Sequence, residues 1–305
     1  MASELYRRQV GLLVQCLPFI SDEVCFALKG GTAINLFIRD LPRLSVDIDL
    51  TYLPVKDRSE SLADIDAAMK RIAQRLSAGI PDLRVQEVTM KDEDSITRLQ
   101  VRRGGAQAKI EVSPVIRGCV FDASMRRVSP VVERQYGFAE SQIVSFADLF
   151  AGKIVAALDR QHPRDLFDVR ELLANEGITG EIREAFIVYL ISHNRPMFEV
   201  LEPNLRDIEQ EYERGFRGMT EIPVTLDELL EARTTLISSV VSEMPQSHRD
   251  FLVSFESGQP DWELLSVRDV ESLPAVQWRI ENLTRIENAR RNQLVKNLER
   301  VLRDA

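Results

Sequence analysis

Two aspartates separated by one residue stand in a short apolar segment, Val46-Asp47-Ile48-Asp49-Leu50. The alternation predicts a strand, and successive strand side chains point to opposite faces. Asp47 and Asp49 would therefore share one face, while Val46, Ile48 and Leu50 face a core. Two neighbouring carboxylates repel each other unless a cation lies between them. The pair predicts a Mg²⁺ site, because Mg²⁺ takes oxygen ligands and often bridges to substrate phosphates.

A pair of glycines, Gly30 and Gly31, comes shortly before this strand and is followed by Thr32. We expect a turn that joins a buried strand over 24–28 to a helix over 33–38, with Thr32 as the helix N-cap. Backbone N–H groups at a helix N-terminus favour anions, so the turn is a candidate site for the phosphates of a nucleoside triphosphate (NTP). An ordinary strand-to-helix turn is the alternative, because the pair matches neither a Walker loop nor a dinucleotide fingerprint.

Three further residues belong to this first candidate site. Glu111, on the outward face of a later strand, is a third carboxylate that could bind the metal. Ser45 shares the face of Asp47 and Asp49, where its hydroxyl would contact either phosphate or solvent. Arg43 is either a structural ion-pair partner, which we favour, or a ligand to phosphate.

A second candidate cluster lies more than a hundred residues later. Lys153 is surrounded by small and apolar residues, where an anionic ligand explains an ammonium better than water does. Asp165 and Asp168 are one helical turn apart and share one side of a helix. They are candidates for catalysis or for positioning a ligand, with a structural pairing to a neighbouring arginine as the alternative.

These residues need a scaffold that combines a sheet with helices. Gly104 and Gly105 predict a hairpin turn, and from about residue 145 onward the pattern is helical, including a charged final stretch over 276–302. We expect an α+β fold over 1–145, followed by an all-α domain over 146–305. The expected elements of the front half are helices over 4–17 and 57–78, and strands over 24–28, 44–52, 83–88, 97–102 and 106–113.

Composition limits the class of protein. The 305 residues include 44% hydrophobic and 29% charged residues, which is typical of a soluble globular protein. No segment has the length and hydrophobicity of a membrane span or a secretory signal, and three scattered cysteines indicate reduced thiols and a cytoplasmic location. A formal net charge of -9 disfavours a dedicated nucleic-acid-binding protein, although a local basic surface is compatible with it. The residues that could form such a surface are Arg98, Arg102, Arg103, Lys109 and Arg117.

Four motifs in this order resemble the AbiEii/AbiGii toxin family, nucleotidyltransferase-like proteins of the DNA polymerase β superfold. They are Gly30-Gly31-Thr32, the Arg43-x-Ser45-x-Asp47-x-Asp49-Leu50 segment, Lys153-Ile154-x-Ala156-x-x-x-Arg160 and Arg164-Asp165-Leu166-Phe167-Asp168. The resemblance covers about residues 20–175. It implies a nucleotidyltransferase-like mixed sheet with flanking helices, and a helical domain that contributes residues to the site.

The resemblance also implies roles for the motif residues. Gly30–Thr32 would shape the nucleotide pocket, and Asp47 and Asp49 would hold magnesium. Lys153 matches the family's motif lysine, which is needed for toxicity. Asp165 and Asp168 match the later acidic motif, in which one acid is needed for activity.

The hypothesis is a Mg²⁺-dependent nucleotidyltransferase that transfers NMP from an NTP to an acceptor. The resemblance implies the toxin of a type IV toxin–antitoxin system, acting on tRNA 3′ ends to block translation, with a cognate winged-helix antitoxin. One alternative is a nucleotidyltransferase that modifies a protein or a small cationic molecule such as an aminoglycoside. Another is a non-catalytic nucleotide-binding module, against which the intact acidic pair argues.

Overall fold

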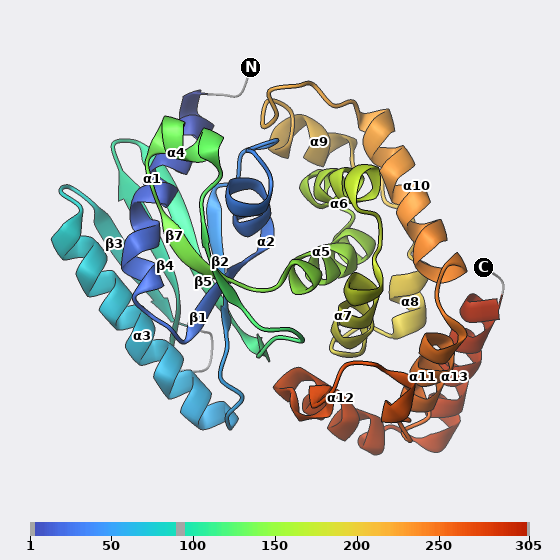
Figure 1. Ribbon diagram of the computed structural model, residues 1–305. Helices are drawn as coiled ribbons and strands as arrows, with labels where there is room; N and C mark the ends of the chain where they lie inside the picture. Colours follow the sequence, from blue (N-terminus) through green and yellow to red (C-terminus); the bar gives the residue numbers. More distant parts are fainter. Residues whose placement is uncertain (1–3, 90–94, 304–305) are drawn as a thin grey trace. The chain divides into compact units, whose positions relative to one another are not determined.

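The computed structural model of the protein describes residues 4–89 and 95–303. The chain forms two compact units (Figure 1). The first, which we call the sheet unit, comprises Met1–Ser145 and Arg217–Pro223. The second, the helical unit, comprises Phe146–Phe216 and Val224–Ala305.

A seven-stranded mixed sheet forms the centre of the sheet unit, with the strand order β3-β4-β5-β2-β1-β7-β6. The pairs β2–β5 and β1–β7 are parallel, and the other neighbouring pairs are antiparallel. This mixed sheet and its helices confirm the α+β expectation. The strands are β1 (Phe26–Lys29), β2 (Asp47–Tyr52), β3 (Arg84–Thr89), β4 (Ile96–Arg103), β5 (Ala106–Arg117), β6 (Ser124–Arg127) and β7 (Glu140–Ile143).

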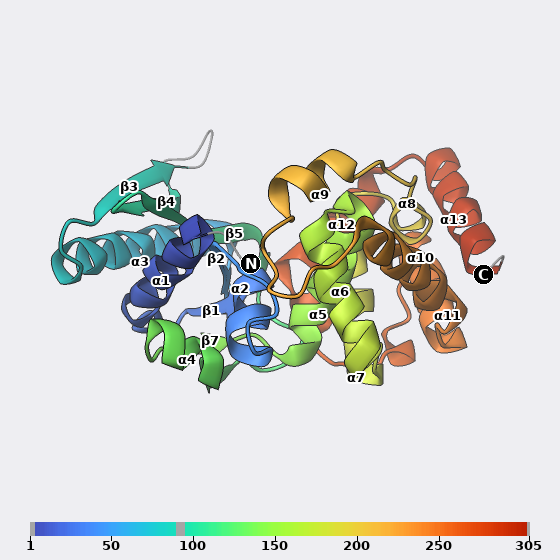
Figure 2. The ribbon, with the colours of Figure 1, turned by 90° about the horizontal axis from the view of Figure 1, so that it is seen from above.

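One face of the sheet is apolar and is covered by helices. α1 (Glu4–Ser21) contacts β5 and β7, and α3 (Arg58–Gly79) contacts β3 and β4. The two helices lie side by side (Figures 1 and 2), and the short α4 (Pro130–Tyr136) contacts α1. Alternate residues of β2 and β5 are buried on the apolar side, while the residues between them form a polar face. This polar face carries the acidic pair.

The sequence predicts that this strand begins at residue 44, but β2 begins at Asp47. The residues before it are held by a distant part of the chain instead of by the sheet. The Leu44 amide donates to the Met219 carbonyl at 2.8 Å, and Arg43 forms an isolated β-bridge with Thr220. Local alternation could not reveal this pairing, because its partner lies about 175 residues later.

The glycine turn also differs from the expected strand-turn-helix pattern. α2 spans Gly30–Ala33 and continues directly into a π-helical turn, η1 (Ile34–Ile38). Lys29 occupies the N-cap position, so the prediction of Thr32 as the N-cap is wrong. The Thr32 hydroxyl is bonded to the segment at the start of β2 instead of to an amide of its own helix.

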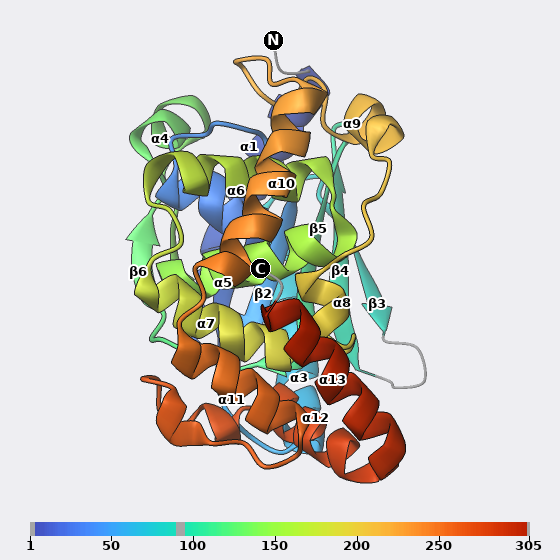
Figure 3. The ribbon, with the colours of Figure 1, turned by 90° about the vertical axis from the view of Figure 1, so that its right-hand side faces the viewer.

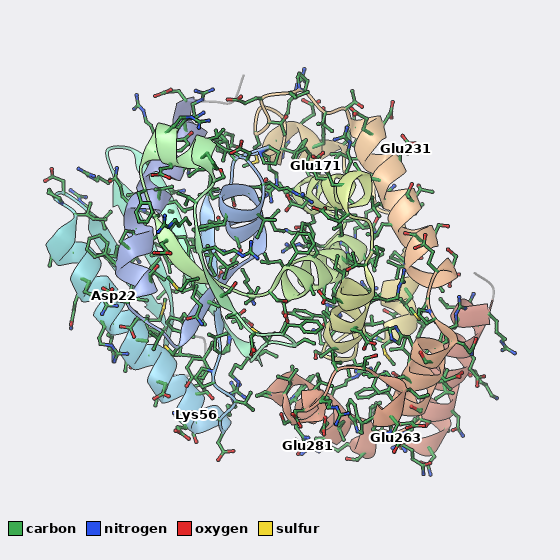
Figure 4. The ribbon with its side chains drawn as sticks, in the orientation of Figure 1. Asp22, Lys56, Glu171, Glu231, Glu263 and Glu281 are labelled. Atoms are coloured by element: carbon green, nitrogen blue, oxygen red, sulfur yellow. The ribbon has the colours of Figure 1, made fainter. Side chains whose placement is uncertain are left out.

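The helical unit is built around α5, which packs against α6 and α7, while α10 packs against α6 (Figure 3). The expected helical final stretch over 276–302 is two helices, because Ile286 adopts an extended conformation between them. The α-helices are α5 (Phe146–Arg160), α6 (Pro163–Asn175), α7 (Gly180–Ile191), α8 (Met197–Leu201), α9 (Glu209–Gly215), α10 (Leu226–Ser242), α11 (Gln246–Glu256), α12 (Pro274–Arg285) and α13 (Asn288–Arg303). Exposed acidic side chains such as Glu231, Glu263 and Glu281 project from this unit (Figure 4).

Candidate active site

The acidic pair occupies the polar face of β2. Asp47 and Asp49 are both partly exposed, while Ile48 and Leu50 are buried on the opposite side. The alternation inferred from the sequence is thus present in the strand, although Val46 precedes β2 and is only partly buried. Two partly exposed carboxylates thus lie on one face of the strand.

The glycine turn lies directly against this pair. Gly30 has φ +72°, and a Cβ atom there would lie 2.7 Å from Asp49 Oδ2. A Cβ atom at Gly31 would lie 2.5 Å from Arg43 Nη2 and 3.1 Å from Ser45 Oγ. The positive φ of Gly30 favours glycine there, and a side chain at either position would require Asp49 or Arg43 to move.

Two buried hydroxyls connect the turn to the start of β2. Thr32 Oγ1 is hydrogen-bonded to the Ser45 hydroxyl at 2.9 Å and donates to the Asp47 carbonyl. Thr32 and Ser45 are 0% and 7% exposed, so neither side chain simply faces solvent. The two hydroxyls therefore fix the position of the turn relative to the carboxylates.

Arg43 is buried beside the glycine turn. Its side chain is 3% exposed, and its Nη1 donates to the Leu44 carbonyl at 3.0 Å. Its Nη2 lies close to Gly31, so the guanidinium packs against the turn while it is held by the Leu44 carbonyl.

A row of charged residues crosses four neighbouring strands through Asp49. In register, Lys29 on β1 is next to Asp49 on β2, which is next to Glu111 on β5, which is next to Arg98 on β4. Glu111 Oε1 accepts from Arg98 Nη2 at 2.6 Å, and Oε2 lies 2.7 Å from Lys109 Nζ. Burial alone would raise the pKa of Glu111, but Lys109 and Arg98 hold it below its usual value.

The positions of these carboxylates determine which of them could hold Mg²⁺. Among the residues that the structure describes, no group of three or more His, Cys, Asp or Glu side chains is placed to hold a metal ion. Asp47 and Asp49 supply two carboxylates, which fits Mg²⁺, since this ion commonly takes one or two carboxylates plus water and substrate phosphates. Glu111 stays a prediction as a third ligand, and it would have to release Arg98 or Lys109 to bind metal.

The second predicted group is a buried ion cluster in the helical unit. Lys153 Nζ on α5 lies 2.8 Å from Asp165 Oδ1 and 3.0 Å from Asp168 Oδ2 on α6. Arg160 Nε donates to Asp165 Oδ2 at 2.6 Å. The sequence predicted an anionic ligand for Lys153, whereas in the structure its ammonium is paired with the two acids of α6. All three side chains are at most 6% exposed, so each charge depends on the others.

Local structure at the start of α6 places Asp165. His162 is the N-cap and its Nδ1 accepts from the Arg164 amide at 3.1 Å, while Pro163 occupies the first helical turn. Asp165 then falls in the first turn, where a carboxylate is favoured by the helix dipole. Burial would raise the pKa of Asp165, but Lys153 and Arg160 outweigh it and hold this pKa well below its usual value.

The structure brings the predicted residues into two groups. Arg43, Ser45, the acidic pair and the glycine turn belong to the sheet unit, and Lys153 with its two acids belongs to the helical unit. Of the residues expected to form a basic surface, Arg98 and Lys109 are ion-paired with Glu111 and Arg117 is 7% exposed, while Arg102 is exposed.

Sequence reasoning missed Lys29. This residue ends β1, directly before the glycine pair, and is partly buried beside Asp49. Burial lowers the pKa of its ammonium, while Asp49, Cys119 and Glu111 act in the opposite direction. A charged residue at the end of an apolar run, next to a glycine turn, was the signal available in the sequence.

No described helix is long and apolar enough to cross a membrane.

Comparisons with known proteins identify the family to which the chain belongs. No curated protein sequence matches the chain. In structure, the chain is similar to MenT4, a nucleotidyltransferase toxin from Mycobacterium tuberculosis H37Rv, with a TM-score of 0.62 and 13% identity over 98% of this chain and 94% of that one. At this identity the match concerns the fold.

The family model described as nucleotidyl transferase AbiEii toxin, type IV TA system, matches residues 11–282. This match spans both groups of predicted site residues and confirms the resemblance noted from the four motifs. The chain therefore belongs to the AbiEii nucleotidyl transferase toxins of type IV toxin–antitoxin systems.

Proposed function

We propose that this nucleotidyltransferase is Mg²⁺-dependent and uses the polar face of β2 as its reaction centre. An acceptor hydroxyl attacks the α-phosphorus of an NTP, the bond from this phosphorus to the β-phosphate oxygen breaks, and pyrophosphate leaves. The observation that carries the proposal is the glycine turn beside the acidic pair, where a Cβ atom on Gly30 (φ +72°) would lie 2.7 Å from Asp49 Oδ2. Phosphoryl-type transfer depends mainly on positioning and charge neutralisation, which such a site provides.

In this proposal Asp47 and Asp49 hold Mg²⁺, which neutralises phosphate charge when bound. Gly30 and Gly31 let the backbone of the turn lie close to Asp49 Oδ2 and Arg43 Nη2, which places the turn beside the carboxylates where the triphosphate is proposed to bind. Thr32, hydrogen-bonded to the start of β2, keeps the turn in register with the metal ligands.

Lys153 and its two acids are proposed to take part in the same reaction, since the family model matches the segments that contain both groups. Lys153 would neutralise phosphate charge. Asp165 is held ionised by Lys153 and Arg160 and is therefore a weak base, which favours a role in orienting Lys153. Asp168, which also binds Lys153, is then the better candidate for assisting proton transfer.

We propose the 3′ end of tRNA as the acceptor, so that the modification blocks translation in the cytoplasm. The type IV toxin family supports this proposal, and it implies a cognate antitoxin, for which we propose a winged-helix protein. A second candidate acceptor is a cationic small molecule such as an aminoglycoside, or a protein. The net charge of -9 and the exposed acids of the helical unit favour this second class (Figure 4).

The test offers each α-labelled NTP with Mg²⁺ to the purified protein, together with tRNA, total protein or aminoglycosides in separate reactions. We expect label at tRNA 3′ ends, which periodate oxidation of the tRNA before the reaction would prevent. Label found only in protein or aminoglycoside would identify the acceptor as a protein or a cationic small molecule instead of tRNA. NTP binding with no transfer to any acceptor would identify a non-catalytic nucleotide-binding module and contradict the proposal.

A further inference from the structure

A cavity of about 520 Å³ opens beside Asp49 in the sheet unit. This is within the range of small-molecule sites, roughly 300–1,000 Å³. Lys29, Asp49, Glu111 and Arg98, the charged row across the sheet, all line it. Hydroxyl side chains, including Thr97 and Ser113, and apolar residues, including Val88 and Pro114, complete the lining.

Lys29 differs from the other cations of this row. Lys109 and Arg98 each form an ion pair with Glu111, at 2.7 and 2.6 Å. Lys29 is adjacent to Asp49 in register, yet among the described residues its ammonium makes no hydrogen bond and no ion pair within 4.0 Å. A partly buried ammonium in a cavity wall that forms no hydrogen bond or ion pair with the described residues is well placed for an anion that comes from outside the chain.

We propose that this cavity is a phosphate-binding subsite in which Lys29 is the principal cation, so that Lys29 contacts the substrate. The inference deepens the proposed function and rests on it. The ligand class is a phosphate ester, since an ammonium is a compact donor for phosphate oxygens and the neighbouring hydroxyls can donate further hydrogen bonds. The phosphate can belong to the triphosphate of the NTP or to the phosphodiester of a polynucleotide acceptor.

The charge of the cavity supports a phosphate ligand. Asp49 is committed to the metal in the proposed function, and Glu111 is already neutralised by two cations. Lys29 then provides positive charge that no described side chain balances through an ion pair. A cationic ligand would instead meet Lys29 and Arg98 on the cavity wall.

The experiment measures binding by calorimetry in the presence of Mg²⁺, with two probes on the full chain. Inorganic triphosphate represents the NTP, and a short single-stranded RNA without NTP represents the acceptor. Lys29→Met keeps the length of the side chain and removes its charge, and Lys29→Arg keeps the charge. Lys70→Met is the matched control, because Lys70 lies on the exposed side of the same unit, 2.8 Å from Asp66.

We expect Lys29→Met to raise the Kd for one of the two probes by about 10-fold or more, which corresponds to the loss of a charged hydrogen bond. Lys29→Arg should recover part of this loss, and Lys70→Met should bind like the unmodified protein. If Lys29→Met raises the Kd for triphosphate, the subsite binds the NTP. If it raises the Kd for RNA, the subsite binds the acceptor.

Folding is checked by circular dichroism and by the midpoint of urea unfolding. A folded Lys29→Met protein that binds both probes with unchanged Kd would overturn the inference. So would a Lys29→Arg protein that binds as weakly as Lys29→Met although it is folded. Failure of the proposed function looks different, because then the unmodified protein binds phosphate through Lys29 yet transfers no nucleotide.

Discussion

Gly30 is the residue on which the shape of the candidate site depends most directly. Its φ of +72° lies in the left-handed region, and its α-carbon lies against the Asp49 carboxylate. A side chain at this position would therefore be unfavourable for two reasons. The backbone conformation would be strained, and the Cβ atom would lie only 2.7 Å from Asp49 Oδ2. Gly104, in the β4–β5 hairpin, also has positive φ (+54°), but a Cβ atom there would meet no described heavy atom within 4 Å.

Substitutions at Gly30 and Gly104 distinguish the effect of the backbone conformation from the effect of the contact with Asp49. Gly104→Ala should cost about 1–2 kcal/mol of unfolding free energy, which is the backbone term alone, and leave activity unchanged. Gly30→Ala should cost more and lower nucleotide transfer about 100-fold, the size expected when a catalytic group is displaced by about 1 Å. Urea unfolding and labelled NTP incorporation measure the two quantities. Equal activity in the two variants would show that the close approach of Gly30 to Asp49 is unimportant.

At the residue scale, sequence alternation predicted the shared face of Asp47 and Asp49, because strand geometry is local. Thr32 was predicted incorrectly as the helix N-cap, because its hydroxyl is hydrogen-bonded to Asp47 and Ser45, which lie more than ten residues later in the sequence. Lys29 was missed because a lysine at the end of a strand is ordinarily solvated. Its burial follows from the arrangement of four strands, which no local pattern contains.

Helices α5 and α6 are joined by the buried cluster of Lys153, Asp165 and Asp168. Asp165 carries the strongest interactions, with Lys153 at 2.8 Å and Arg160 at 2.6 Å. Its folded-state pKa is lower than that of an unfolded carboxyl. The stabilisation is therefore fully present above the unfolded pKa, near 3.9, and is lost as the pH falls toward the folded value.

Asp165→Asn should destabilise the protein at neutral pH by about 3–5 kcal/mol, since it leaves Lys153 without its closest buried partner. The difference in unfolding free energy between the two proteins should narrow as the pH falls below about 4. Urea titrations over this pH range measure it. Glu202→Gln is the control, because Glu202 pairs with Arg300 on the surface and should cost about 0–1 kcal/mol. A difference that is constant with pH would contradict the assignment of charge to Asp165.

At the element scale, periodicity predicted the helices and strands wherever their partners were local. The hairpin at Gly104 and Gly105 is one example, with β4 and β5 on either side. The final helical stretch divides at Ile286, for which no proline or glycine gives a local signal. The start of β2 was placed too early, because residues 43 and 44 are paired outside the sheet.

The path of the whole chain explains this last difference. Segment Arg217–Pro223 belongs to the sheet unit although the helical unit precedes and follows it in sequence. It holds Leu44 through Met219, and Arg7 lies 3.3 Å from Glu221. The residues just before the acidic pair are thus fixed by a segment from the second half of the chain.

We expect Met219→Ala to destabilise the protein by about 2–5 kcal/mol, because Met219 is buried and its removal leaves a cavity. Transfer activity should fall as well, since the Met219 carbonyl holds the amide of Leu44, which leads into β2. Met125→Ala is the matched control, with an exposed methionine in the same unit. Thermal unfolding with labelled NTP incorporation checks both effects. Loss of stability with full activity in the folded protein would show that the segment supports the fold alone.

Metal-dependent nucleotidyl transfer at β2 is tested most directly by Asp49→Asn, assayed for labelled NTP incorporation and for pyrophosphate release. Asp22→Asn, an exposed acid of the same unit (Figure 4), is the control. We expect the unmodified protein and the control to release one pyrophosphate per nucleotide incorporated, to stop with EDTA and to resume with Mg²⁺. Folded Asp49→Asn should lose about a thousandfold in rate, as expected for several kcal/mol of charge stabilisation. A folded Asp49→Asn protein with full transfer, or transfer that continues in EDTA, would contradict this site.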